Sequence, residues 1–211
     1  MPDKISILIT ALGGEGGGTL MNWILECARK KKLHVQGTSV PGVAQRTGST
    51  SYYIEICNTQ FKFGKEPILS MYPVAGKVDL VISSELLETA RVIERGFVNP
   101  ERTTLISSKS RALTNTEKSH LYDGRFDSMN IIETGSKMAK NFIFLDLQKI
   151  AEESSTIISS PMLGAIAGTN MLPWDKDIFE SVFRDDDFGR KSLVGFRSAY
   201  RKVNDKEYNV I

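Results

Sequence analysis

Hydrophobic positions along this chain change their spacing from one segment to the next, and the spacing predicts where strands and helices lie. Residues 5–12 are mostly apolar and β-branched, which is typical of a strand buried on both faces. Residues 19–32 carry apolar side chains three and four positions apart, which predicts an amphipathic helix. Between them, residues 13–18 contain five glycines and one glutamate, so we expect the strand to turn tightly into the helix.

The rest of the chain continues this alternation, which predicts an α/β fold. Further strands are expected at residues 33–40, 50–56, 67–71, 78–83, 103–107 and 142–145. Further helices are expected at residues 84–96, 116–121, 128–140, 150–154, 162–168, 176–183 and 189–203. The polar residues 58–66 are either a hairpin loop, with 67–71 as a short return strand, or a flexible connection. No linker divides the chain, so residues 1–211 are expected to form one domain.

A glycine-rich turn before a helix is a common place for a nucleotide, because free backbone N–H groups face the ligand there. The dinucleotide fingerprint needs G-x-G-x-x-G or A, and an acidic residue roughly 20 residues further on. Gly14 and Gly16 fit, but Thr19 takes the third position and residues 33–40 contain no acid. Glu15 would also repel a pyrophosphate. An autonomous NAD(P)-dependent oxidoreductase is therefore an alternative, and close helix–strand packing explains the glycines at least as well.

The composition is that of an ordinary globular protein. Of 211 residues, 41% are hydrophobic and 25% are charged, and the formal net charge is +2. This balance gives no reason to expect nucleic acid or an anionic membrane as a partner. The basic residues 29–32 close the first predicted helix, where cations offset the helix dipole. Without a signal segment or an apolar run of about 18 residues, the chain is expected to be cytoplasmic.

Residues that could bind a metal are scarce. Cys27 and Cys57 are the only cysteines, and their places on an apolar helix face and at a strand end indicate buried thiols. An iron–sulfur cluster normally needs four thiolates, so this chain alone is not expected to hold one. His34 and His120 are far apart and form no zinc-binding spacing. We therefore expect no metal site in this chain.

A second segment, residues 41–49, combines residue types suited to binding an anion. Two glycines flank Gln45 and Arg46, and small hydroxyl-bearing residues follow. The guanidinium group offers several donors in one plane, which matches a carboxylate or a phosphate. Nearby hydroxyls and backbone amides would complete such a site. An arginine that braces two loops or a subunit interface explains the same residues, so both interpretations stay open at this point.

Together, these segments resemble the γ-type domain of 2-oxoacid:ferredoxin oxidoreductases, and within that family the β subunits of indolepyruvate oxidoreductases. The glycine-rich turn at residues 13–18 and the G-V-A-Q-R-T-G loop at residues 42–48 carry most of the resemblance. Residues 78–88 are similar to a strand and acidic helix start of the family, and residues 161–168 to its late helix of small residues. The resemblance extends over most of residues 5–200.

The resemblance implies a Rossmann-like three-layer α/β fold with a mostly parallel sheet, an added β-hairpin and a helical C-terminal third. It also implies one subunit of an enzyme that oxidatively decarboxylates a 2-oxo acid, either indolepyruvate or another aryl pyruvate, to an acyl-CoA. Thiamine diphosphate, Mg²⁺ and iron–sulfur clusters would lie on a larger partner subunit, coenzyme A would take the acyl group, and ferredoxin would take the electrons. This chain would bind no cofactor alone, would be inactive by itself, and could form a homodimer when isolated.

The same resemblance supplies the candidate site residues, and it assigns a catalytic role to none of them. Arg46 would contact a substrate carboxylate or a phosphate of coenzyme A. The substrate- or CoA-facing residues are Gln45, Arg46, Thr47, Gly48 and Ser49, and the glycine-rich turn comprises Gly13, Gly14, Glu15, Gly16 and Gly17. Glu85 is a further candidate, although an acid at a helix start is stabilising by itself. A non-catalytic module that binds coenzyme A or another anionic metabolite through the same loop is the remaining alternative.

Overall fold

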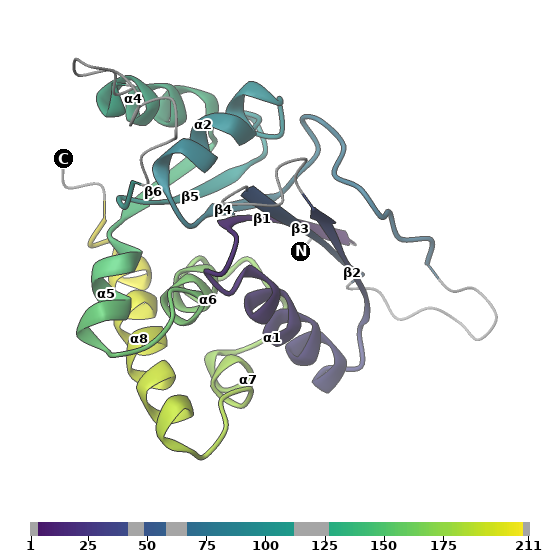
Figure 1. Ribbon diagram of the computed structural model, residues 1–211. Helices are drawn as coiled ribbons and strands as arrows, with labels where there is room; N and C mark the ends of the chain where they lie inside the picture. The colour runs from purple at the N-terminus through teal and green to yellow at the C-terminus, as the bar shows by residue number, and fades with distance from the viewer. Residues whose placement is uncertain (1–3, 42–48, 58–66, 112–126, 209–211) are drawn as a thin grey trace.

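Six strands form a single sheet in the part of the chain that the structure describes. The structure is a computed structural model, and it describes residues 4–41, 49–57, 67–111 and 127–208. The strands lie in the order β2-β3-β1-β4-β5-β6 (Figure 1). In chain order they are β1 (Lys4–Leu12), β2 (His34–Pro41), β3 (Ser49–Cys57), β4 (Leu80–Ser83), β5 (Thr104–Ser108) and β6 (Asn141–Leu145).

Among these six strands, only β3 runs in the opposite direction. The strands β1, β4, β5 and β6 are parallel to their neighbours, whereas β3 is antiparallel to both β1 and β2. Because β2 and β3 are consecutive in the chain, they form the antiparallel hairpin that is added to the parallel sheet. In this register Ser49, the first residue of β3, pairs with Leu12, the last residue of β1. The predicted mostly parallel sheet with an added hairpin is confirmed.

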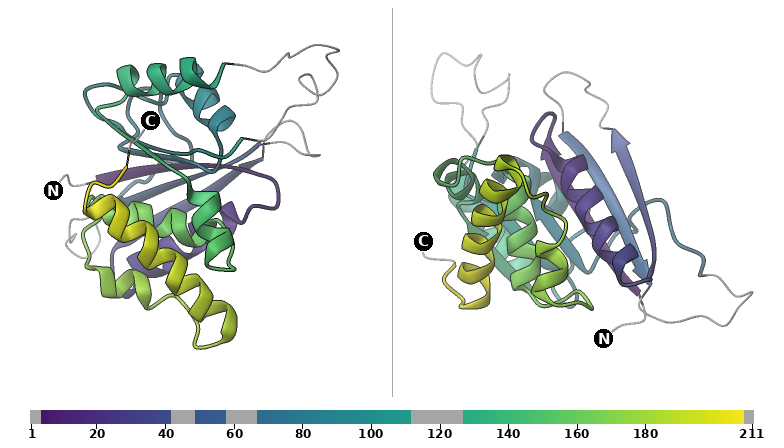
Figure 2. Two further views of the ribbon diagram at one scale, coloured as in Figure 1. Left: turned by 90° about the vertical axis from the view of Figure 1, so that its left-hand side faces the viewer. Right: turned by 90° about the horizontal axis from the view of Figure 1, so that it is seen from below.

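Helices cover both faces of the sheet, so the protein has three layers. The helices α2 and α4 lie on one face, and α1, α5, α6, α7 and α8 lie on the other (Figure 1 and Figure 2). The described helices are α1 (Gly17–Lys30), α2 (Leu86–Glu94), α4 (Ser128–Met138), α5 (Leu147–Glu153), α6 (Ser159–Gly168), α7 (Lys176–Glu180) and α8 (Asp187–Asn204). The predicted three-layer fold with a helical C-terminal third is confirmed.

The helix α6 is the centre of the larger core. All of its residues are buried, because they are small or apolar and the helix lies among the other elements on its face of the sheet. Its backbone approaches that of α8 closely at Gly164, where a Cβ atom would lie 2.1 Å from the carbonyl oxygen of Phe196. A smaller core fills the space between the sheet and the helices α2 and α4. Burial of these apolar side chains is the main stabilising contribution to the fold.

One predicted strand is wrong. Residues 67–71 form an extended segment outside the sheet, because β3 is already paired along both edges and leaves no free edge for a return strand. Instead, the backbone N–H of Ser70 donates to the side-chain carboxylate of Glu55 in β3, 2.7 Å away. Pro67 has no N–H to contribute to a strand ladder. The predicted loop at residues 58–66 and the predicted helix at residues 116–121 lie outside the described residues.

Candidate functional site

The carboxyl ends of β1 and β4 lie where the connections after neighbouring strands go to opposite faces of the sheet. The two strands are parallel neighbours, but α1, which follows β1, lies on one face of the sheet, whereas α2, which follows β4, lies on the other (Figure 1). The chain segments that leave the two strands therefore diverge, and ligands of open α/β sheets bind at such a switch point. Here the diverging segments are the glycine-rich turn, residues 13–17, and Ser84 with Glu85.

Backbone conformation and close packing both require glycine in the turn. Gly14 and Gly16 have φ angles of +94° and +80°, which side chains disfavour. Gly17 lies against the ring of Tyr52 in β3, and a Cβ atom on Gly17 would come within 2.5 Å of that ring. The glycines therefore allow α1 to begin close to the sheet.

The carboxylate of Glu15 ties the turn to the end of β4. One of its oxygens, Oε2, accepts the backbone N–H of Leu12 at 3.1 Å. The same oxygen accepts the hydroxyl of Ser84, which is fully buried. The carboxylate of the turn is thus bonded to Leu12 at the end of β1 and to Ser84 just after the end of β4.

On its other side the turn is held by α6. The buried hydroxyl of Ser159 donates to the carbonyl oxygens of Gly16, at 2.8 Å, and of Glu15, at 3.2 Å. Sequence reasoning missed both Ser84 and Ser159. Their partners lie 69 and 143 residues away in the chain, and no local pattern distinguishes these serines from others.

Glu85 is the N-cap of α2. Its carboxylate oxygens accept the backbone N–H groups of Leu87 at 3.1 Å and of Glu88 at 2.9 Å, and the residue is only 2% exposed. Bonds of this kind satisfy helix N–H groups that otherwise have no partner. The geometry therefore gives Glu85 a structural role at the start of α2.

The residues of the second motif lie mostly outside the described part of the chain. This applies to Gln45, Arg46, Thr47 and Gly48, whereas the backbone of Ser49 is described. The two ends of the loop are fixed by strand pairing, since Pro41 pairs with Thr50 and Ser49 pairs with Leu12. The loop therefore starts and ends beside the glycine-rich turn, and the structure brings the anchors of the two motifs to one edge of the sheet.

The cysteines are buried, as predicted. Cys27 lies on α1 with no measurable exposure, and Cys57 ends β3 at 4% exposure. Burial raises the pKa of the Cys27 thiol to about 12, which keeps it protonated and unreactive. Among the described residues, no group of three or more His, Cys, Asp or Glu side chains could hold a metal ion. In that same part of the chain, no helix combines the length and apolarity needed to span a membrane.

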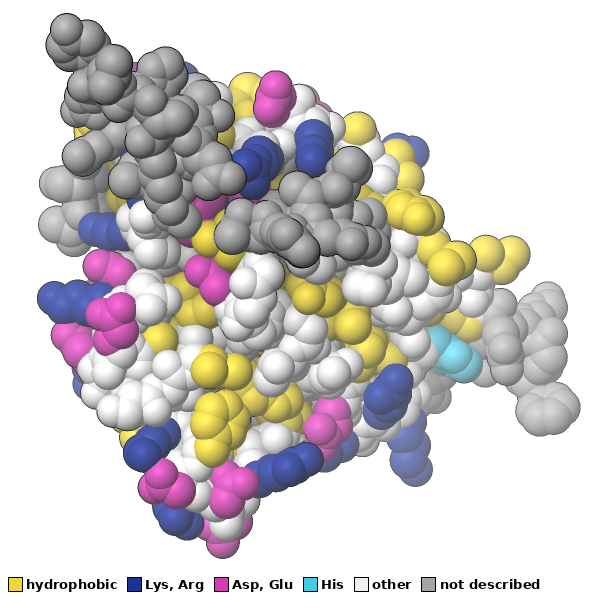
Figure 3. Space-filling view, viewed as in Figure 1, with side chains coloured by type: hydrophobic (Ala, Val, Ile, Leu, Met, Phe, Trp, Pro, Cys, Tyr) yellow, Lys and Arg dark blue, Asp and Glu magenta, His cyan; other side chains and the backbone are white. Residues whose placement is uncertain are grey.

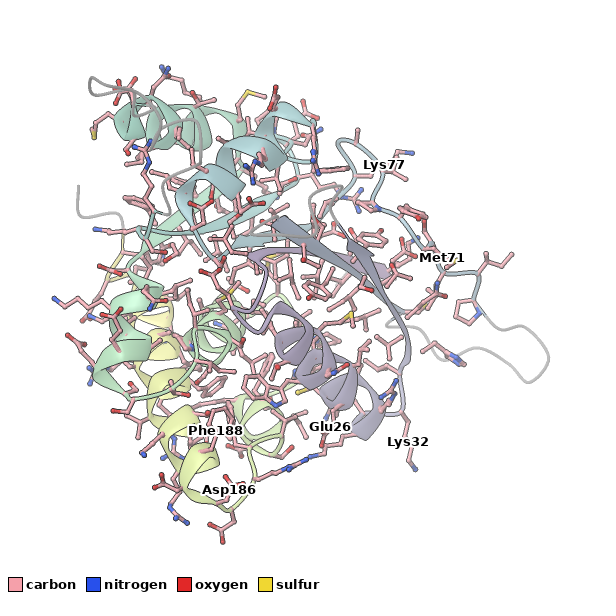
Figure 4. The ribbon with its side chains drawn as sticks, in the orientation of Figure 1. Glu26, Lys32, Met71, Lys77, Asp186 and Phe188 are labelled. Carbon is pink, nitrogen blue, oxygen red and sulfur yellow. The ribbon has the colours of Figure 1, made fainter. Side chains whose placement is uncertain are left out.

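The basic cluster of the first predicted helix, residues 29–32, lies away from the switch point. The cluster at residues 29–32 lies at the opposite end of α1 from the turn, where Figure 4 labels Glu26 and Lys32. Lys30 pairs with Glu26 at 3.1 Å and donates to the carbonyl oxygen of Ser181 at 2.7 Å, which fits a structural role for the cluster. Figure 3 shows side chains of both charge signs intermixed over the lower end of the molecule, around α8.

Comparison with known proteins gives a consistent result. The family model described as "Pyruvate ferredoxin/flavodoxin oxidoreductase" matches residues 6–200. The chain is 26% identical to indolepyruvate oxidoreductase subunit IorB of Thermococcus kodakarensis, covering 86% of this chain and 85% of the relative. It is 28% identical to the protein of the same name from Methanothermobacter thermautotrophicus, covering 86% of this chain and 87% of the relative.

Solved structures share the fold at low sequence identity. The γ subunit of the keto/oxoacid ferredoxin oxidoreductase of Geobacter sulfurreducens aligns with a TM-score of 0.65 at 12% identity, over 94% of this chain and 98% of that one. Subunit PORC of the Thermotoga maritima pyruvate oxidoreductase aligns with a TM-score of 0.63 at 15% identity, over 95% and 97%.

A longer chain contains the same fold. The 2-oxoglutarate:ferredoxin oxidoreductase of Magnetococcus marinus, solved with 2-oxoglutarate, coenzyme A and succinyl-CoA bound, aligns with a TM-score of 0.66 at 12% identity. The alignment covers 98% of this chain and 32% of that one, so this chain spans about a third of that protein. Because the family model matches nearly the whole sequence, the chain belongs to the pyruvate ferredoxin/flavodoxin oxidoreductase family, and the prediction of a 2-oxoacid:ferredoxin oxidoreductase subunit is confirmed.

Proposed function

We propose that this subunit serves an enzyme that oxidises indolepyruvate or a related aryl pyruvate. The observation that carries the proposal is the match to relatives named indolepyruvate oxidoreductase subunit IorB, which extends over 86% of this chain. In the proposed reaction the 2-oxo acid loses CO₂, coenzyme A takes the acyl group as a thioester, and two electrons pass to ferredoxin. The thiol proton of coenzyme A is released.

In this proposal a larger partner subunit carries out the decarboxylation and the electron transfer. An iron–sulfur cluster is normally held by four thiolates, and this chain has two cysteines, Cys27 on α1 and Cys57 on β3, both buried. The donor set of this chain therefore does not fit a cluster. Thiamine diphosphate, Mg²⁺ and the clusters are assigned to the partner, and ferredoxin is the electron acceptor of the complex.

Arg46 is the proposed anion contact of this subunit. Its guanidinium group would bind a phosphate of coenzyme A or the substrate carboxylate, and Gln45, Thr47, Gly48 and Ser49 would shape the same surface. The proposal is supported by the positions of the loop ends, because Ser49 pairs with Leu12 at the carboxyl edge of the sheet, where ligands of α/β proteins bind.

Exposed apolar side chains and buried thiols support proposals for the state of the isolated chain and for its compartment. Ile68 is 97% exposed, and Met71, Tyr72 and Val74 are each at least half exposed; Figure 4 labels Met71 on this extended segment. A chain without its partner would hide such side chains by pairing with itself, so we propose a homodimer for the isolated subunit. Cys27 and Cys57 are both reduced thiols, which fits a reducing compartment, and we propose the cytoplasm.

Reconstitution tests the proposal. Co-expression with the large thiamine- and cluster-binding subunit should give a complex that reduces ferredoxin with indolepyruvate and coenzyme A, whereas this chain alone should be inactive. Arg46→Ala in the complex should raise KM for either coenzyme A or the 2-oxo acid, and the affected ligand identifies the contact. Arg95→Ala, an exposed arginine at the end of α2, is the matched control. Activity of the chain alone would overturn the proposal, and equal effects of the two variants would remove Arg46 from it.

The alternatives are separated by titration. An autonomous NAD(P)-dependent enzyme gains no support from the geometry, because β3 lies between β1 and β2 and β2 contains no acid for a ribose hydroxyl. A non-catalytic module would bind coenzyme A tightly without a partner. Weak binding of coenzyme A by the isolated chain and tight binding by the complex would favour the subunit over the non-catalytic module.

A further inference from the structure

The strand β2 forms an open edge of the sheet. It is first in the strand order and pairs on one side only, with β3. Among the residues that the structure describes, no backbone hydrogen bond joins residues 35–39 to an element other than β3. Every second residue of such a strand turns its N–H and C=O groups outward, where another strand can bond to them.

The features that usually protect an edge strand are missing from β2. Residues 35–40 contain no charged residue and no proline, and the pairing with β3 continues from His34 to Pro41 without a bulge. Natural proteins blunt exposed edges with such features or by keeping the strand short. The opposite edge strand β6 has five residues, whereas β2 has eight. The edge of β2 is therefore suited to pairing with another chain.

An apolar segment lies beside the same edge. It comprises four side chains that are each at least half exposed: Ile68, Met71, Tyr72 and Val74. Figure 3 shows hydrophobic side chains in a row at the upper right of the molecule, where Figure 4 labels Met71. The hydroxyl of Thr38, near the middle of β2, donates to the carbonyl oxygen of Met71 at 2.6 Å. The backbone of the apolar segment therefore lies against the middle of the edge strand.

We propose that β2 and the apolar segment form the surface on which a second copy of this chain docks, with the two β2 strands paired antiparallel about a twofold axis. The inference rests on the homodimer proposed above for the isolated subunit, and it names the interface. An antiparallel pair of identical strands is self-complementary, and in full register the twofold axis passes through the middle of both strands. The two apolar segments then meet across the axis, because each lies beside Thr38.

The size and charge of this surface suit a homodimer. A paired strand of eight residues is about 27 Å long, and with one layer of side chains on each face its contact buries roughly 400 Å² per copy. The partly exposed side chains of the apolar segment add roughly 200–300 Å² per copy. Both copies together bury about 1,300 Å², which lies within the range of about 1,200–2,000 Å² for specific interfaces. Because residues 35–40 carry no charge, the pairing brings no like charges together.

The oligomeric state of the isolated full chain tests the interface. Ser39→Lys places a charge at an exposed position of β2, and Met71→Lys places one on the apolar segment, so like charges meet across the axis. Sedimentation equilibrium should show a wild-type dimer whose dissociation constant rises at least about tenfold in each variant. Val194→Lys is the matched control, because Val194 lies on α8 and is 58% exposed, as Met71 is. It should leave the constant unchanged.

The outcomes distinguish this interface from the proposals on which it rests. A wild-type dimer that both Ser39→Lys and Met71→Lys leave intact overturns the interface, while the homodimer stands. A monomeric wild-type chain overturns both, and the activity of the reconstituted complex remains a separate measurement. If the wild type is monomeric and the same two variants lose binding to the large subunit, the surface belongs to that subunit and the pairing with a second copy is wrong.

A measurement on the wild type needs no substitution. Dilution of the chain through its dissociation constant should speed amide hydrogen exchange in residues 35–39, because the outward N–H groups of β2 lose their partners. The other edge strand, β6, is the internal control and should keep its exchange rate. Equal exchange of β2 in the dimer and the monomer would overturn the proposal even if every variant failed to fold.

Discussion

The hydroxyl of Ser159 donates to the carbonyl oxygen of Gly16 at 2.8 Å, across 143 residues of sequence. This bond joins the N-terminal turn to the first turn of α6, a helix in which every residue is buried. The turn is therefore fixed from two sides, by α6 through Ser159 and by β4 through the bond between Glu15 and Ser84. The position of α1 relative to the sheet depends on both contacts.

Gly16→Ala should destabilise the protein much more than Gly14→Ala. Both glycines have positive φ angles, which cost an alanine about 1–2 kcal/mol. At Gly16 the added Cβ would also lie 2.4 Å from Oγ of Ser159, whereas at Gly14 it would meet nothing within 4 Å. We expect losses in the free energy of unfolding of about 2–4 kcal/mol for Gly16→Ala and about 1–2 kcal/mol for Gly14→Ala. Urea unfolding measures both, and equal losses would show that Ser159 does not confine the turn.

The sequence predicts which segments are strands and helices better than it predicts which strands pair with one another. The apolar runs that become β1 and β4 are continuous because these strands are buried on both faces, so their identity is readable locally. The extended segment at residues 67–71 has the same local character. It is not a strand because β3 has no free edge, which is a property of the whole sheet.

The candidate site is likewise only partly predictable from the sequence. The glycines are visible in the sequence because their φ angles and close contacts restrict the residue type. The role of Glu15 is not visible, because it depends on a hydroxyl supplied by Ser84, 69 residues further along the chain. Only the register of β1 against β4 brings the two side chains together.

Asp79 should be important for stability at the amino edge of the sheet. Its carboxylate accepts the backbone N–H of Ser6 at 2.8 Å, the hydroxyl of Ser6 at 2.7 Å and Nε of Arg102 at 2.8 Å. Asp79→Ala removes the side-chain acceptor of the buried Ser6 N–H, whereas the Ser6 hydroxyl can still donate to the carbonyl oxygen of Lys77 at 3.1 Å. The loss should cost about 1–3 kcal/mol.

Arg102→Ala is the control for the Asp79 prediction. The Arg102 side chain is 45% exposed, and the Ser6 donors stay bonded when it is removed, so the loss should be below about 1 kcal/mol. Thermal and urea unfolding report both values. A larger loss for Arg102→Ala than for Asp79→Ala would mean that the ion pair, rather than the bonds to Ser6, carries the contribution.

Glu55 should hold the extended segment at residues 67–71 against the sheet. Burial alone would raise the pKa of Glu55, but bonds from the hydroxyl of Tyr53, the N–H of Ser70 and the ammonium of Lys4 lower it overall. Glu55→Gln removes the charge that these donors share, so the amide of Ser70 should exchange its hydrogen faster. Hydrogen exchange detected by mass spectrometry measures this.

Thr38→Val is the control for the segment. It removes only the bond of 2.6 Å from the Thr38 hydroxyl to the carbonyl oxygen of Met71. Exchange at Ser70 should change less in this variant than in Glu55→Gln. Unchanged exchange in Glu55→Gln would mean that the segment is held by its other contacts.

Glu180 should make stability depend on acid pH. Its carboxylate accepts Nε and Nη2 of Arg197 at 2.9 and 2.6 Å and lies 3.0 Å from Nζ of Lys176. The hydrogen bonds from Arg197, more than any other cause, lower the pKa of Glu180 from 4.5 to about 2. A carboxyl group whose pKa is lower in the folded state stabilises the protein above its unfolded pKa, and this contribution disappears as the pH falls through the folded value. Glu180→Gln should therefore cost a constant amount above pH 5, and progressively less between pH 4.5 and 2.

The size of the Glu180 effect is limited by solvent. Arg197 is 54% exposed, so screening should keep the loss at neutral pH to about 1 kcal/mol, and salt should reduce it further. Glu133→Gln breaks an exposed pair with Lys137 at 3.7 Å on α4 and should cost no more than about 0.5 kcal/mol. Urea unfolding of the wild type and both variants between pH 2 and 8 makes the comparison. A cost of Glu180→Gln that stays the same from pH 7 to pH 2 would contradict the prediction, because the ion pair would then contribute nothing that protonation removes.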